Sequence, residues 1–84
     1  MRVSIDSISV NGLVTGNCGE YRFQAKVYDE PSYCGINRGR VSKLNIREGS
    51  YSMDLVNYDR GWDIKPKGKL VHVFNTIVDA IEDL

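Results

Sequence analysis

Residues 21–30, YRFQAKVYDE, begin with a run that alternates between apolar and polar side chains as far as Val27. The odd positions as far as Val27 are apolar, whereas Arg22, Gln24 and Lys26 occupy the positions between them. Successive side chains of a β-strand point to opposite faces, so this stretch predicts a strand with one face on a hydrophobic core and a cationic face turned away from it. We expect each of the other segments either to cover the apolar face of this strand or to extend its cationic face.

Three further segments predict strands. Residues 3–16 carry apolar side chains of mixed parity, which predicts either one bulged strand or two short strands. Residues 40–47 and 51–58 contain alternating apolar positions and are separated by the short turn at residues 48–50. Because short turns join only antiparallel neighbours, we expect a four-stranded antiparallel meander.

The C-terminal segment, residues 70–84, predicts the helix of the fold. At about 100° per residue its large apolar side chains form one stripe. The members of the stripe are Leu70, Phe74, Ile77, Ile81 and Leu84. Such a helix packs on the apolar face of the sheet. The predicted fold class is therefore α+β in the order ββββα, with residues 59–68 as a connection and residues 1–84 as a single domain.

The composition is typical of a globular protein without net attraction for nucleic acid or anionic lipid. The chain has 11 basic and 11 acidic residues, so binding to a polyanion would require an uneven distribution of charge. The N-terminal residues lack the apolar run of a signal peptide, and no segment has the apolar length needed to span a bilayer. We therefore expect a cytoplasmic protein that does not bind membranes, in which Cys18 and Cys34 stay reduced.

The charges are unevenly distributed over the predicted sheet. If the helix covers the apolar face, four basic side chains point from the other face, with Arg40 at its margin. These four are Arg22, Lys26, Lys43 and Arg47. Two interpretations remain open, namely a solvated surface of mixed charge or a face that binds a partner. The central strand lacks exposed aromatic side chains for stacking of bases, so direct binding of nucleic acid is less expected than binding of a protein.

Cys34, His72 and Asp29 are the candidate residues for a metal site, because thiolate, imidazole and carboxylate groups all bind zinc. Their spacing matches no zinc motif. A site that joins them requires the loop containing Cys34 to wrap around the start of the helix, and zinc is kept as a hypothesis on that condition.

Catalytic motifs are missing from the sequence. There is no nucleophile elbow, phosphate-binding loop or dinucleotide-binding glycine motif. The single histidine, His72, has no serine or cysteine partner in register. We therefore expect a protein that is not an enzyme.

Four short segments together resemble a small uncharacterised domain found in phages and prophages of Gram-positive bacteria. They are AKVYDEPS (25–32), GIN (35–37), GRVSKLNI (39–46) and NYDRGWD (57–63). The resemblance extends over residues 21–84. The chain departs from it in a longer N-terminal strand region and in Cys34, which occupies a loop position where cysteine is not expected. The resemblance implies no catalytic residue.

In size and setting the chain is similar to anti-CRISPR proteins, which block RNA-guided nucleases of the host. The similarity implies a phage-encoded inhibitor that binds a host defence protein stoichiometrically, with a type II RNA-guided nuclease as the expected target. The residues expected to bind the partner are the basic set Arg22, Lys26, Arg40, Lys43 and Arg47 and the acidic set Asp79, Glu82 and Asp83. Two alternatives stay open: a nucleic-acid-binding accessory protein of the phage, and a structural component of the virion.

Overall fold

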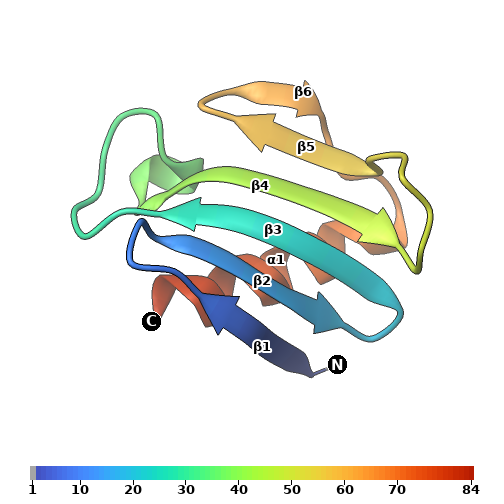
Figure 1. Ribbon diagram of the computed structural model, residues 1–84. Helices are drawn as coiled ribbons and strands as arrows, with labels where there is room; N and C mark the ends of the chain where they lie inside the picture. The colour runs from blue at the N-terminus through green and yellow to red at the C-terminus, as the bar shows by residue number, and fades with distance from the viewer. Residues whose placement is uncertain (1) are drawn as a thin grey trace.

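The computed structural model describes residues 2–84, which form an antiparallel sheet with one α-helix on one of its faces (Figure 1). In the described residues the sheet has six strands that lie side by side in the order of the sequence, so it is a simple meander. The strands are β1 (Val3–Ile8), β2 (Leu13–Cys18), β3 (Tyr21–Val27), β4 (Val41–Glu48), β5 (Val56–Asp59) and β6 (Trp62–Ile64). A 3-10 turn, η1 (Ile36–Arg38), precedes β4, and the helix is α1 (Lys69–Glu82).

The predicted number of strands is wrong, although the α+β class and the single C-terminal helix are confirmed. The N-terminal region forms two strands, because a turn at residues 9–12 separates them. In this turn the amide of Gly12 donates to the carbonyl of Ser9 (3.0 Å), and the hydroxyl of Ser9 accepts the amide of Leu13 (3.1 Å). The mixed parity of the N-terminal region has a second cause, a β-bulge at Asp6 that shifts the register between β1 and β2.

The C-terminal half of the sheet also differs from the prediction. Only residues 56–58 of the predicted strand 51–58 belong to a strand, which extends to Asp59, and residues 49–55 form a loop. Residues 62–64, predicted as part of a connection, form β6. The Trp62 ring lies edge-on to Tyr58 (centroids 5.1 Å apart) and tilted against Phe74 of α1 (5.2 Å), so aromatic packing holds this short strand.

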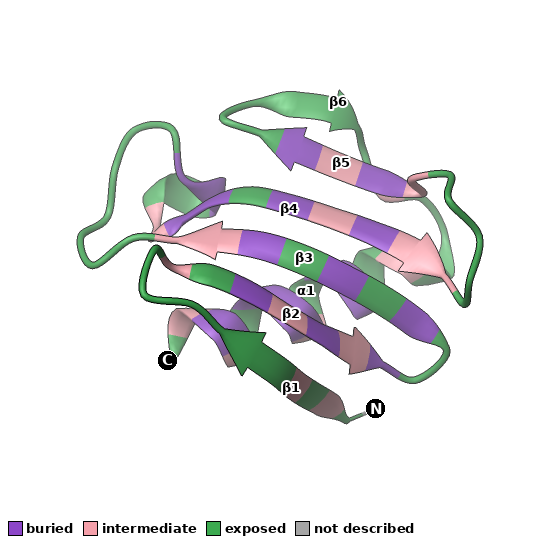
Figure 2. Ribbon diagram, viewed as in Figure 1, coloured by how far each residue is buried: buried purple, intermediate pink, exposed green. Residues whose placement is uncertain are grey.

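The core lies between the sheet and α1. Alternate residues of β3, from Tyr21 to Ala25, are buried, as Figure 2 shows by the change of colour along the strand. The helix contributes five buried side chains to the same cluster: Val73, Phe74, Ile77, Val78 and Ile81. The opposite side of the sheet is covered by no helix in residues 2–84, and we call it the open face. It carries the even-numbered side chains of β3 and the side chains in register with them.

The part of the chain that the structure describes contains no helix both long and apolar enough to cross a membrane.

Candidate docking face on the open side of the sheet

Two pairs of cations lie directly opposite each other on the open face. In the ladder between β3 and β4, Arg22 is the Cα partner of Arg47, and Lys26 is the Cα partner of Lys43. Like charges that face each other across an antiparallel pair destabilise a sheet, by roughly 0.2–1 kcal/mol each. The strand register therefore gathers the predicted basic residues of these strands at the centre of the open face.

Neighbouring side chains hold these cations. The guanidinium of Arg22 donates to Asn17 Oδ1 (2.7 Å) and to Asp6 Oδ2 (3.0 Å). The ammonium of Lys43 lies 3.8 Å from Asp59 Oδ1. The acidic partners Asp6 and Asp59 come from β1 and β5. The alternation of residues within β3 and β4 therefore does not predict them. The open face therefore has a cationic centre with an acidic margin.

The remaining two cations are also held by neighbours. The Lys26 ammonium donates to the carbonyl of Asn11 and lies 5.5 Å from the centre of the Tyr28 ring. The guanidinium of Arg47 donates through Nε to Asp54 Oδ1 (2.7 Å), whereas its two Nη atoms make no hydrogen bond within residues 2–84. Arg47 thus presents the forked end of its guanidinium to an incoming group.

Asp54 organises this part of the face and was not singled out from the sequence. Its carboxylate accepts hydrogen bonds from Arg47 Nε, from Asn45 Nδ2 (3.3 Å) and from Asn57 Nδ2 (2.8 Å). The residue lies in the loop between β4 and β5, which the sequence predicted to be strand. The sequence offered one indication of this loop, because an aspartate in the middle of the predicted strand 51–58 disfavours a strand there.

Uncharged polar side chains separate the two cation pairs. Thr15, Gln24, Asn45 and Asn57 are consecutive Cα partners across β2, β3, β4 and β5. They form a row of hydroxyl and amide groups at right angles to the strands, able to donate and accept hydrogen bonds.

Two hollows lie on either side of this row. The Arg hollow, about 330 Å³, is lined by Arg22 and Arg47 together with Ser50, Tyr51 and Ser52 of the β4–β5 loop. The Lys hollow, about 240 Å³, is lined by Lys26, Lys43 and Asp59 among others. Tyr51 is 73% exposed, beside Met53 at 75%. Tyrosine and arginine side chains next to shallow hollows are the residue types that contribute most at protein–protein interfaces.

Two other predicted partner-binding residues have an internal role. Glu82 Oε2 accepts the backbone amides of Arg40 (2.9 Å) and Val41 (3.2 Å), and Arg40 Nη2 donates to the carbonyls of Glu82 (3.0 Å) and Leu84 (2.5 Å). Both side chains therefore tie the end of α1 to the start of β4. Asp79 and Asp83 are exposed on and just after the helix, on the other side of the sheet from the cation pairs. The structure does not bring the predicted acidic and basic sets together.

The predicted zinc ligands are not brought together either. Cys34 lies exposed in the β3–β4 connection, where its carbonyl accepts the Tyr58 hydroxyl (2.9 Å), and His72 lies on the exposed side of α1. Asp29 follows β3 and is exposed. Within residues 2–84 no group of three or more His, Cys, Asp and Glu side chains is arranged to hold a metal ion. The loop that carries Cys34 packs near β5 instead of wrapping around the helix.

A family model described as "Domain of unknown function (DUF7678)" matches residues 9–82. The chain belongs to the DUF7678 family. The match contains the cation pairs, Asp54 and the Arg40–Glu82 contacts, and it begins directly after β1. No curated protein and no solved structure matches this DUF7678 chain.

Proposed function

We propose that this DUF7678 chain is a phage-encoded inhibitor that binds a host defence protein in the host cytoplasm and performs no chemistry of its own. The target proposed is a type II RNA-guided nuclease, bound either in its nucleic-acid channel or on its recognition lobe. The observation that carries the proposal is the Arg22–Arg47 pair, two like charges held opposite each other on a face that no helix of residues 2–84 covers. Asp6 and Asp54 already compensate part of their repulsion, and an acidic group of a partner compensates more of it and accepts hydrogen bonds from the free Nη atoms of Arg47.

The acidic margin of the face supports a protein as the partner. Asp6, Asp54 and Asp59 each lie within 4 Å of a basic side chain of the centre. The phosphates of a nucleic acid form a continuous array, so they would meet these carboxylates as well as the cations. A protein surface can instead place a single carboxylate at the centre of the face and basic groups at its margin. For this reason the nucleic-acid-binding accessory protein is the second candidate.

A cleavage assay tests the proposal. The chain is used to capture proteins from a lysate of a Gram-positive host, and a type II nuclease is purified, loaded with guide RNA and titrated with the chain. We expect cleavage of target DNA to fall in proportion to the chain and to stop near equimolar amounts. The double variant Arg22→Gln with Arg47→Gln should lose inhibition, and Asp79→Asn with Asp83→Asn should retain it.

Other outcomes distinguish the alternatives. Undiminished cleavage at a large molar excess of the chain contradicts the nuclease as target. A gel shift of DNA or RNA that weakens steeply with salt supports the accessory protein, because release of counterions makes phosphate binding salt-dependent. Sedimentation of the chain with phage particles supports a virion component.

A further inference from the structure

The outer edge of β1 is an unpaired strand edge. β1, with six residues, ends the sheet on one side, and β6, with three, ends it on the other (Figure 1). In residues 2–84 no strand pairs with the outer side of β1. Lysine, proline or a covering loop protects many such edges from another strand. Residues 2–5 contain neither lysine nor proline and precede the bulge at Asp6, so this part of the edge is open to pairing.

The sequence of this edge, RVSID at residues 2–6, is complementary to itself in the antiparallel direction. When Ser4 lies opposite Ser4 of a second copy, Val3 lies opposite Ile5 and Arg2 lies opposite Asp6. Each apolar side chain then meets an apolar one and each charge meets its opposite, the cross-strand pairs that stabilise a sheet.

The faces of these side chains fit the pairing. Val3 and Ile5 are in register with Cys18 and Gly16 of β2, which are buried on the helix side. Ser4 is in register with Asn17 on the open face. The Asp6 side chain also lies on the open face, where it accepts a hydrogen bond from Arg22.

Other registers lack this match. A shift by two residues places Ser4 opposite Arg2 or Asp6 and removes both ion pairs. A shift by one residue places apolar side chains against polar ones, because it exchanges the faces of the strand. The regular part of the edge ends at Ile5, and the bulge places Asp6, the last residue of the match, directly after it.

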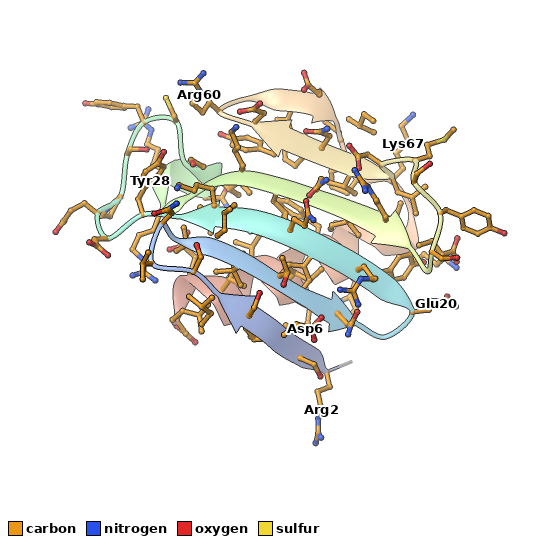
Figure 3. The ribbon with its side chains drawn as sticks, viewed as in Figure 1. Arg2, Asp6, Glu20, Tyr28, Arg60 and Lys67 are labelled. Carbon is orange, nitrogen blue, oxygen red and sulfur yellow. The ribbon has the colours of Figure 1, made fainter. Side chains whose placement is uncertain are left out.

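The charged ends of the edge are free to make these contacts. Arg2 is exposed, forms no ion pair within the described residues, and extends away from the sheet beyond the start of β1 (Figure 3). The Asp6 side chain is 42% exposed and binds Arg22 through Oδ2, which leaves Oδ1 for a second donor.

We propose that a second copy of this chain pairs with the edge of β1, antiparallel and about a two-fold axis through Ser4. The two sheets then form one twelve-stranded sheet. Both open faces lie on the same side of it, because the axis is perpendicular to the sheet. The inference is independent of the proposed function, since it uses only β1 and Arg2. If the open face binds a partner, the dimer presents two such faces and gains avidity.

Sedimentation equilibrium tests the dimer. An edge of five residues is short for a protein interface, so the wild-type chain should pass from monomer to dimer between roughly 10 μM and 1 mM. Arg2→Asp places aspartates opposite each other at both ends of the edge, and Asp6→Arg does the same with arginines. Each variant should raise the dissociation constant at least roughly tenfold. Lys67→Asp, an equal change of charge at an exposed site elsewhere, should leave it unchanged.

The mixture of the two variants is the decisive measurement. In a heterodimer of Arg2→Asp with Asp6→Arg, each aspartate at position 2 meets an arginine at position 6, and each aspartate at position 6 meets an arginine at position 2. The equimolar mixture should therefore dimerise as well as the wild type, although neither variant does so alone. If Asp6→Arg fails to fold, the dissociation constant of Arg2→Asp tests the dimer by itself. Arg2 makes no ion pair within residues 2–84, so its replacement breaks no such contact inside the monomer. A monomeric wild type at 1 mM, or a dimer that Arg2→Asp retains, overturns the inference.

Discussion

Glu82 and Arg40 bind each other's backbone. The Glu82 carboxylate accepts the amide of Arg40 at 2.9 Å, and the Arg40 guanidinium donates to the carbonyl of Glu82 at 3.0 Å. Through these bonds the last turn of α1 is attached to the start of β4, more than 40 residues earlier in the chain. Both side chains are partly buried, so water competes with these bonds only in part.

Glu82→Ala should therefore destabilise the fold. The variant leaves the amides of Arg40 and Val41 without their acceptor and Arg40 without its carboxylate, and we expect a loss of about 1.5–3 kcal/mol in the free energy of unfolding. Glu82→Gln should lose less, since an amide oxygen still accepts both N–H groups. Urea titration measures the differences, with Asp83→Asn, an exposed neighbour, as the control within about 0.5 kcal/mol of the wild type. Equal midpoints for Glu82→Ala and Asp83→Asn would contradict the role given to Glu82.

Asp54→Ala should loosen the β4–β5 loop and one side of the open face. Three side-chain donors, on Asn45, Arg47 and Asn57, lose their acceptor, and we expect a loss of about 1.5–3 kcal/mol. Asp59→Ala is the matched control, because its exposed contact with Lys43 at 3.8 Å should contribute less than about 1 kcal/mol. Amide hydrogen exchange should show faster exchange in residues 50–55 for Asp54→Ala alone. Unchanged exchange in that loop would mean that other contacts hold it.

The regular parts of this fold were predictable because one periodicity governs each. In β3 and in the helix, the periodic apolar side chains face the same core, so the pattern of β3 and the stripe from Phe74 to Ile81 identified them. The bulge at Asp6 moves Ile8 out of phase with Val3 and Ile5, which hid the boundary between β1 and β2. β6 is exposed at all three positions and is held by the Trp62 ring, so it has no period to detect.

The candidate site was predictable only where it follows a strand. Lys26 and Lys43 lie on the predicted face because alternation places them there. The carboxylates that hold Arg22 and Arg47 could not be located from the pattern, because Asp6 lies at a β-bulge and Asp54 lies in a loop. Arg40 and Glu82 were assigned to a partner because sequence alone does not show that the helix ends beside β4.

The two thiols should differ in reactivity. Cys18 is fully buried and Cys34 is exposed, so a thiol reagent should modify one group quickly in the native protein. Cys34→Ser should remove the fast reaction, and urea should make Cys18 reactive. A fast reaction that survives in Cys34→Ser would show that the end of β2 opens readily.

Stability should also depend on pH through Cys18. Burial raises the pKa of its thiol, so the folded chain keeps a proton that the unfolded chain loses. The contribution to stability is complete below the ordinary thiol pKa and is lost as the pH rises through the raised pKa of the folded state. Unfolding in urea at increasing alkaline pH should show a decline that is smaller in Cys18→Ala. An identical decline in both proteins would assign it to other groups.

Gly16→Ala should be among the most harmful single-methyl additions in the sheet. Gly16 lies in β2 beneath the Phe23 ring, and a Cβ atom there would lie 2.2 Å from the carbonyl oxygen of Ser4 and 2.8 Å from the ring. Backbone on one side and a buried aromatic on the other leave no room for relaxation, so we expect a loss of about 1–3 kcal/mol. Gly61→Ala is the control, since no atom lies within 4 Å of the position that its methyl group would take and its backbone is compatible with alanine.

The control should be neutral or stabilise by up to about 1 kcal/mol, because alanine restricts the unfolded chain more than glycine does. Thermal unfolding of both variants gives the comparison. A Gly16→Ala protein as stable as Gly61→Ala would mean that β1 moves outward to admit the methyl group, and that the β1–β2 ladder is held more loosely than its register indicates. The same looseness would weaken the edge on which the RVSID pairing depends, so this variant also measures how firmly β1 is fixed to the sheet.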